Sequence, residues 1–314
     1  GWFCVKHSPK AGRRRQRLIF DRRPQNATEA PLRWARLPHG SQLCRAVLES
    51  HEGLRGSGDD LEAFFFQLAH GQGWHARNAV GRPFESRQLP ELVPAGAPPH
   101  KRWRLALTVV GMGDTKGVDI AQEAHECVLR EGQCLRASES LHYGQVTPAS
   151  ATPEGVYVDD HLAGQRMPRC CLACVRGVQE CEACASRARP WRDQEIVESS
   201  EKIYEVHELR RNQTKGFRYK RYFESWGTAV FGEEGRVQTP PDKVRQLSRL
   251  GFSMLRGRPF SSAGILQQWT GSLIHPFSHL KILMCSFDAI YSFIADINYS
   301  GRVRVPARIQ DELL

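Results

Sequence analysis

The sequence predicts an α+β fold in which an antiparallel sheet is flanked by helices. Two hairpin patterns predict strands: one joins short runs of β-formers at 3–5 and 17–21, and the other joins 223–231 to 236–237 through a glycine-containing turn. Helical periodicity predicts a helix over 118–130 and an amphipathic helical region from residue 242 onwards. Further elements are expected at 41–50 (helix), 104–110 (strand), about 143–160 (strand pair) and 186–222 (helical and basic).

Composition describes a globular chain with an excess of positive charge. The 314 residues are enough for two or three subdomains, and 40% hydrophobic and 25% charged residues are ordinary values. The net charge of +10 favours a polyanionic partner, nucleic acid before a membrane surface. Arginine crowds the first hairpin, where we expect phosphate binding, with a charged edge hairpin or a targeting signal as the alternatives.

Neither a secretory leader nor a membrane span is expected. The first six residues show no signal peptide, and the chain does not begin with Met, so we expect a fragment or an incomplete gene model. The most apolar long stretch, 273–297, contains two histidines, a lysine and an aspartate, which a transmembrane helix would rarely carry. We therefore expect an intracellular protein, cytoplasmic or nuclear, whose ten cysteines are thiols or metal ligands rather than disulfides.

Two acidic pairs stand beside β-forming or aromatic residues. Asp159 and Asp160 follow a short run of β-formers, where a hairpin tip would let both carboxylates meet one hard cation such as Mg²⁺. A solvated Asp-Asp turn is the alternative. Asp59 and Asp60 precede an aromatic run and predict a strand turning into a helix, in which an acidic N-cap and a metal ligand are compatible roles.

Two further segments carry candidate chemistry. Cys171, Cys174, Cys181 and Cys184 form two C-x-x-C pairs with the spacing of a zinc site. The six residues between the pairs are fewer than the usual number of about 12–20, so a cysteine-rich surface insertion is the alternative. The glycine-rich segment 111–117 lacks the spacing of a P-loop, but its glycines allow close approach of a ligand.

Taken together, five blocks in order resemble the polymerase region of a reverse transcriptase from a retroelement, over roughly residues 1–295. The blocks are a fingers strand ending in D-x-R-x-x-N (17–26), a first palm motif (60–68), Gly113 with Gln122 nine positions later, the signature Tyr157-Val158-Asp159-Asp160, and a primer-grip hairpin (226–230). Downstream, 266–273 is similar to a thumb helix.

The resemblance implies a right-hand polymerase with fingers, palm and thumb and an antiparallel palm sheet. The expected bounds are fingers at 1–55 and 73–105, the first palm motif at 56–72, the rest of the palm at 106–235 with a Cys-rich insertion at 168–186, and thumb or connection helices at 236–314.

The resemblance also implies an activity: RNA-directed DNA synthesis, in which dNTPs are added to a DNA primer 3′-hydroxyl on an RNA (or DNA) template. Two Mg²⁺ or Mn²⁺ ions would be held by Asp60, Asp159 and Asp160, with Asp59 as the alternative to Asp60. Further polyprotein domains, such as RNase H, integrase or endonuclease, would lie outside this chain.

The remaining site residues follow from the same resemblance. Nucleotide binding would involve Arg17, Lys10 (or Lys6), Phe65 (Phe64 if Asp59 is the ligand), Gly113, Gln122 and Lys215. Trp226 and Gly227 would hold the primer end. Gly111, Met112 and the pair Val118-Asp119 depart from the family pattern at the nucleotide pocket. The alternative function is therefore a catalytically inactive, nucleic-acid-binding remnant of such an element.

Overall fold

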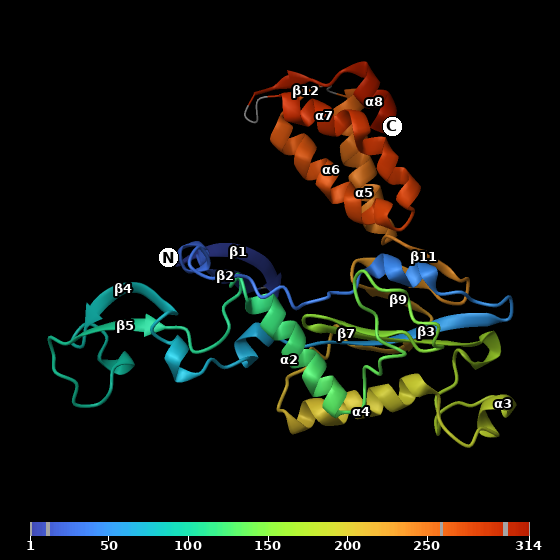
Figure 1. The fold of residues 1–314 in the computed structure, drawn as a ribbon, viewed down its shortest axis with the longest axis horizontal. Coiled ribbons are helices and arrows are strands. Elements are labelled where there is room, and N and C mark those ends of the chain that lie inside the picture. Colours follow the sequence, from blue (N-terminus) through green and yellow to red (C-terminus); the bar gives the residue numbers. More distant parts are fainter. Residues whose placement is uncertain (1, 11–12, 258–259, 298–300, 314) are drawn as a thin grey trace.

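The computed structural model describes residues 2–10, 13–257, 260–297 and 301–313. At its centre lies a four-stranded antiparallel sheet in the order β6-β7-β3-β8 (Figure 1). The strands are β3 (Glu52–Asp60), β6 (Glu154–Tyr157), β7 (Asp160–Pro168) and β8 (Phe217–Lys220). Helices flank this sheet, so the predicted α+β fold with an antiparallel sheet is confirmed at that level.

Two helices cover one face of the central sheet. They are α2 (Gly117–Glu131), which matches the expected helix at 118–130, and α4 (Arg192–Val206) (Figure 1). In α4 the buried residues Ile196, Ile203 and Tyr204 recur at helical spacing and make one apolar stripe. They pack with Leu129 of α2 and Val156 of β6 into a single core. This core fixes the sheet against the two helices.

The opposite face carries a smaller sheet of order β11-β10-β9. Its strands are β9 (Tyr222–Ser225), β10 (Thr228–Phe231) and β11 (Arg236–Gln238). Phe223 and Val230 pack with Leu54 and Leu162 of the central sheet. The single strand expected at 223–231 is wrong, because a second tight turn divides it.

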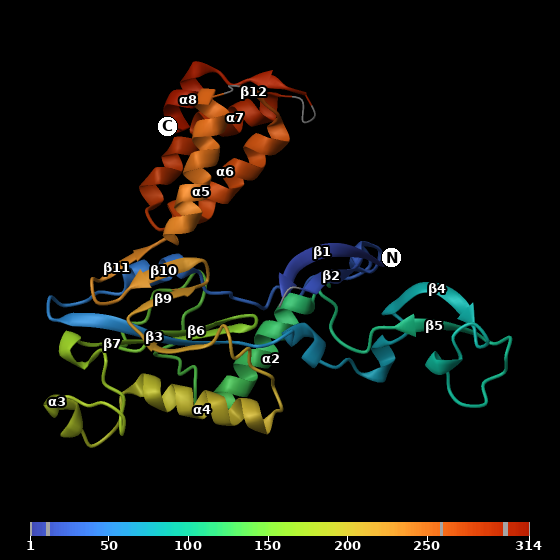
Figure 2. The ribbon, with the colours of Figure 1, turned by 180° about the vertical axis from the view of Figure 1, so that it is seen from behind.

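Two extensions lie beside the central sheet. One is the antiparallel hairpin of β1 (Trp2–Lys10) and β2 (Arg13–Phe20), which includes both strands expected there and is followed by the one-turn helix α1 (Arg23–Asn26). The other pairs β4 (Ala79–Glu85) with β5 (Arg102–Ala106), which overlaps the strand expected at 104–110. Figure 2 shows β4 and β5 at the end of the molecule farthest from α3 (Glu182–Ala185).

The C-terminal region forms a separate helical lobe (Figure 2). Its helices are α5 (Pro241–Phe252), α6 (Ala263–Ser278), α7 (Asp288–Asp296) and α8 (Ala307–Leu313), with the short strand pair β12 (Phe260–Ser261) and β13 (Val303–Arg304). The lobe has its own core, in which the indole N–H of Trp269 donates to the carbonyl of Leu247 at 3.1 Å. Within the described residues, no helix combines the length and apolar character needed to cross a bilayer.

Three local expectations are wrong. Only a 3₁₀ turn, Gly40–Arg45, forms where a helix was expected at 41–50, because the chain becomes extended again at Ala46. The segment 186–222 is not helical throughout: after α4 the chain supplies β8, which completes the central sheet beside β3. The strand pair expected at about 143–160 lies further along the chain, as β6 and β7.

Candidate active site

Strand register brings three aspartates together at one end of the strands of the central sheet. Asp60, the last residue of β3, is paired with Asp160, the first residue of β7. The backbone N–H of Leu61 donates to the carbonyl of Asp159 at 2.9 Å, which places the β6–β7 turn beside the end of β3. The predicted hairpin tip is therefore present, but its two-residue turn is Val158-Asp159, closed by the pairing of Tyr157 with Asp160.

The turn holds Val158 in an unfavourable backbone conformation. Its φ of 57° lies in the left-handed region, which β-branched residues rarely adopt. The buried side chain of Gln122 accepts a hydrogen bond from the Val158 N–H at 2.8 Å and donates to the carbonyl of Val156 at 2.9 Å. His125 contacts the Val158 carbonyl at 2.8 Å. Two side chains of α2 thus stabilise the turn that presents Asp159.

The tautomer of His125 follows from its partners. The Val158 carbonyl can only accept, so Nδ1 of His125 carries the proton, and Nε2 accepts from the Tyr204 hydroxyl at 2.7 Å. Complete burial lowers the pKa of His125 to about 3, against the raising effect of that hydrogen bond. The imidazole is therefore neutral, and its two hydrogen bonds connect α2 to α4 and to the β6–β7 turn.

Burial and like charge raise the pKa values of the two hairpin carboxyls. Burial is the larger cause for both; the neighbouring carboxylates add to it and bring the pKa of Asp160 to about 7. Lys215 forms an ion pair with Asp60, and this hydrogen-bonded contact raises the pKa of Lys215. The site therefore sets three carboxyls against one lysine, with negative charge left to be neutralised.

The donor chemistry of this site fits a hard divalent cation. All three side chains offer carboxylate oxygens, which Mg²⁺ and Mn²⁺ prefer. A bound cation would offset the burial and, to a smaller extent, the charge of Asp60 that raise the pKa of Asp159. In the described part of the chain, three-residue groups with ligand atoms within 4.8 Å of one another consist of cysteines alone. The carboxylates are more widely spread than that, so ion binding requires their side chains to rotate inward.

Asp59 and Asp60 both line the pocket described below, but they have different ionic partners. Oδ1 of Asp59 accepts from Arg218 at 2.8 Å and lies 3.6 Å from Arg211, so this carboxylate already has two cationic partners. Four residues after the end of β3, Phe64 is fully buried against His125, with ring centroids 5.3 Å apart. Phe65 is half-buried and lies next to Gly117 at the start of α2. This geometry favours Asp60 with Phe65 over Asp59 with Phe64.

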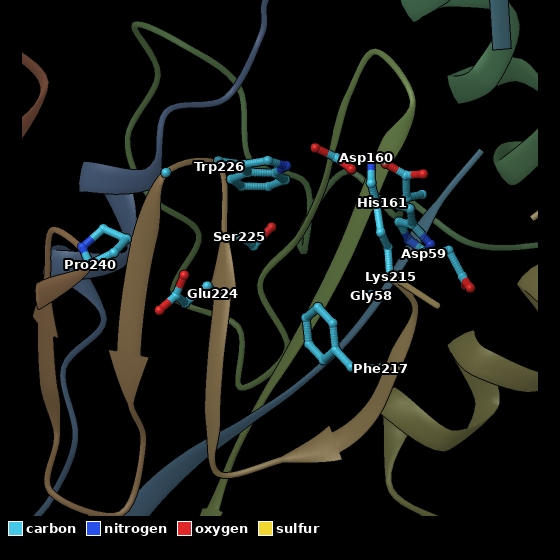
Figure 3. A pocket seen from close by; sticks show the side chains of 12 residues that line it. Gly58, Asp59, Asp160, His161, Lys215, Phe217, Glu224, Ser225, Trp226 and Pro240 are labelled. Carbon is cyan, nitrogen blue, oxygen red and sulfur yellow. Dashed lines mark hydrogen bonds and ion pairs between the residues drawn. The ribbon is translucent and has the colours of Figure 1, made fainter. Parts of the chain in front are cut away.

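A pocket of about 340 Å³ opens beside the carboxylates. Its lining comes from the ends of β3 and β7, from Lys215 and from the β9–β10 hairpin. Figure 3 shows Trp226 on the side of the β9–β10 hairpin, and Asp160 and Phe217 on the side of the central sheet. Trp226 and Gly227 form the two-residue turn between β9 and β10, and their φ values of 49° and 69° match a type I′ hairpin.

Two histidines that sequence reasoning did not assign hold this turn against the C-terminal lobe. Nε2 of His275 lies 3.2 Å from the Trp226 carbonyl, and Nε2 of His279 lies 2.9 Å from the Thr228 hydroxyl. A Cβ at Gly227 would lie 3.0 Å from the His275 ring, so the glycine permits this close approach. In the sequence these histidines only marked 273–297 as too polar for a membrane span.

The glycine loop before α2 is held by the segment after β2. The side-chain amide of Asn26 donates to the carbonyl of Gly113 at 2.7 Å and accepts from the N–H of Thr115 at 3.0 Å. Gly113 has a φ of +93°, which requires glycine. Buried Arg22 forms an ion pair with Asp114 in the same loop. The expected D-x-R-x-x-N segment therefore acts here as a brace for the loop.

Among the predicted nucleotide-binding residues whose side chains the structure describes, Lys215 lines the pocket, whereas Phe65, Gly113 and Gln122 do not. Gln122 is 2% exposed, and its side chain is hydrogen-bonded to the β6–β7 hairpin and to Glu126, so its contribution would be indirect. The side chains of Lys10 and Arg17 lie outside the described residues, although the backbone of both belongs to the β1–β2 hairpin. Lys6, the alternative to Lys10, is exposed on β1.

No family model matches the chain, and no curated protein matches it by sequence. Solved structures of foamy viral protease-reverse transcriptase do match in fold. The complex with dsDNA has a TM-score of 0.56 at 12% identity, covering 99% of this chain and 50% of that one. The complex with an RNA/DNA hybrid has a TM-score of 0.56 at 13% identity and covers 99% of this chain and 32% of that one. A form described as dRH, in complex with ds DNA, has a TM-score of 0.55 at 11% identity and covers 99% of this chain and 44% of that one.

These comparisons define the fold class. The chain has a reverse-transcriptase-like fold, and it spans about a third to a half of the length of the solved chains that it matches.

Proposed function

We propose that this protein is an RNA-directed DNA polymerase derived from a retroelement. The observation that carries the proposal is that Asp60, Asp159 and Asp160 meet at one end of the central sheet. A pocket lies beside them, and the Trp226-Gly227 turn lines its other side. The reverse-transcriptase-like fold supports it independently of these residues.

The lobes of the structure support a right-hand arrangement. The central sheet with α2 and α4 would be the palm, the β1–β2 and β4–β5 extensions the fingers, and the helical lobe from α5 to α8 the thumb. Because β11 pairs with β10, residues 236–238 belong to the smaller sheet β11-β10-β9, and the thumb would begin at Pro241.

Each side chain has a role that its position allows. Two Mg²⁺ (or Mn²⁺) ions, when bound, would activate the primer 3′-hydroxyl and stabilise the leaving oxygen. Asp60, Asp159 and Asp160 would hold them, and Lys215 would then be released from Asp60 to meet the phosphates of the dNTP. The half-buried ring of Phe65 would limit the space beside the sugar.

Charge and the matching complexes support the choice of partners. The matching proteins were solved with dsDNA and with an RNA/DNA hybrid, and this chain carries a net charge of +10. A template–primer duplex is accordingly the proposed substrate, and its binding should weaken steeply with salt as phosphate contacts are replaced by counterions.

The test is dNTP incorporation on poly(rA)/oligo(dT) with Mg²⁺ or Mn²⁺. Wild type should extend the primer, and Asp159→Asn should not. Asp296→Asn, an exposed carboxylate of α7, is the matched control and should retain activity. If the folded wild type binds the duplex without extending the primer, the polymerase proposal is wrong. The alternative, a catalytically inactive nucleic-acid-binding remnant, would then hold.

A further inference from the structure

Four cysteines gather at the end of the central sheet opposite to the aspartates. They lie between the end of β7 and the start of α4, on the 3₁₀ turn Arg169–Cys171, the loop after it and the short helix α3. Cys174, Cys181 and Cys184 have ligand atoms within 4.8 Å of one another, and Sγ of Cys171 lies 3.6 Å from Sγ of Cys181. The six residues between the two C-x-x-C pairs would also allow the pairs to lie apart, so their proximity is a property of the fold.

The two C-x-x-C segments adopt the same local geometry. In each, the backbone N–H of the second cysteine donates to the carbonyl of the first, at 2.9 Å for Cys174 to Cys171 and at 2.9 Å for Cys184 to Cys181. A tight hairpin joins the two turns, with Val175 bridged to Gln179 and Gly177 at a φ of +73°. The short linker that departs from the usual zinc spacing therefore folds back far enough to bring the pairs together.

Three of the four cysteines are buried, and two of the sulfur atoms accept hydrogen bonds from N–H donors. Cys171, Cys174 and Cys184 are 2%, 4% and 6% exposed. The backbone N–H of Cys181 donates to Sγ of Cys174 at 3.3 Å, and the indole N–H of Trp191 donates to Sγ of Cys184 at 3.4 Å. Donors directed at sulfur stabilise metal-bound thiolates and orient them.

The surroundings are also positively charged. Arg176, Arg187 and Arg189 line a cavity that Cys174 and Cys184 share, and the Arg187 guanidinium stacks 3.8 Å over the ring of Trp191. Zn²⁺ bound by four thiolates carries a net charge of about −2, which such arginines would offset.

We propose that Cys171, Cys174, Cys181 and Cys184 bind one structural Zn²⁺ ion. A tetrahedral site with Zn–S bonds of about 2.3 Å places its sulfurs roughly 3.8 Å apart, close to the observed 3.6 Å between Cys171 and Cys181. The segment between β7 and α4 contributes few apolar side chains, so a metal would supply the stability that a core does not.

The proposed zinc would act on the central sheet through Arg55. This fully buried residue of β3 forms a two-point ion pair with Asp193 of α4, at 2.6 and 2.9 Å, and donates to the carbonyl of Cys174. The cysteine loop is thus bonded to the strand that ends in Asp60. The zinc proposal does not rest on polymerase activity.

The first experiment is metal analysis of the full chain purified without chelators, after growth with zinc. About one zinc per chain is expected, with X-ray absorption showing a shell of four sulfurs and cobalt substitution giving tetrahedral thiolate absorption. Absence of stoichiometric zinc, before and after reconstitution of the reduced protein, would overturn the proposal. So would fewer than ten titratable thiols in denatured, chelated, unreduced protein, since that result indicates disulfides.

Matched variants identify the ligands. The competing ligand is Cys170, whose Sγ lies 3.7 Å from Sγ of Cys171 and within 4.8 Å of Cys181. Cys174→Ser should lose the zinc, whereas Cys170→Ser should keep it, because Cys170 is exposed and lies outside both C-x-x-C pairs. If Cys174→Ser fails to fold, Cys181→Ser, at a half-exposed position, provides the same test. Loss of zinc from Cys170→Ser alone, with retention in the other variants, would overturn the ligand assignment.

Discussion

Strands β3 and β7 run side by side from Glu52 and Pro168 at one end to Asp60 and Asp160 at the other, and the two ends differ in chemistry. One end gathers carboxylates, which suit hard cations such as Mg²⁺. The other leads into cysteines, which suit softer ions such as Zn²⁺.

The two ends also differ in what holds them. The carboxylate end depends on packed elements far away in sequence: α2 supplies Gln122 and His125, which stabilise the strained turn at Val158. The cysteine end depends on local turns and on sulfur atoms that lie close together. Proteins can afford strain where a rigid core surrounds it, whereas a loop without a core needs a cross-link.

The largest effect is expected at the carboxylate end. Asp60→Asn should lower the rate of dNTP incorporation at least about 10⁴-fold, or roughly 5.5 kcal/mol in activation free energy, because a metal ligand is lost. Asp59→Asn is the matched control and should stay within about tenfold of wild type, since its carboxylate is bound to Arg218. Steady-state incorporation assays measure both, and the reverse ranking would show that Asp59 is the ligand.

The second prediction concerns Arg55, which connects β3 to the cysteine loop and to α4. Arg55→Met should lower the free energy of unfolding by about 3–5 kcal/mol, because Asp193 is left charged and buried without its partner. The double variant Arg55→Met/Asp193→Leu should recover most of that loss, since it removes both charges. Urea denaturation followed by circular dichroism gives the values. A double variant no more stable than Arg55→Met would contradict this account.

The third prediction tests the strained turn. Gln122→Leu should cost about 1–3 kcal/mol in unfolding free energy, because the N–H of Val158 loses its acceptor. The rate constant for incorporation should fall more than the affinity for dNTP, since Gln122 lies behind the hairpin. Glu123→Gln, on the exposed side of the same helix, should change neither quantity by much. Equal effects of the two substitutions would argue against a positioning role for Gln122.

The smallest effect, counted over one pH unit, is a dependence of stability on pH. The folded-state pKa of His125, about 3, lies below the unfolded value of about 6.5, so the unfolded chain binds the extra proton between these pH values. The free energy of unfolding should therefore fall as pH decreases below 6.5, by up to about 1.4 kcal/mol per pH unit from this group. His125→Gln should flatten that slope, whereas His100→Gln, at an exposed position, should not. An unchanged slope in His125→Gln would rule out this source.

Sequence reasoning succeeded where a local pattern carries the information. The helix at 118–130 shows in its periodicity, and the turn at 232–235 shows in its glycines, because both depend on neighbouring residues. It failed where packing overrides local preference: β8 reads as part of a helical, basic segment, yet it pairs with β3. The division at Trp226-Gly227 was missed because tryptophan is a poor signal for a left-handed turn position.

By itself the sequence determined which chemical groups are present and their local spacing: the two Asp-Asp pairs, the two C-x-x-C pairs and the glycines that allow tight turns. Only the tertiary structure decided which aspartate of the first pair faces the other two, since that depends on the register between β3 and β7, about a hundred residues apart in the chain. It also decided that Gln122 and His125 support a strained turn. Such contacts arise from burial and pairing between distant segments, which no short stretch of sequence specifies.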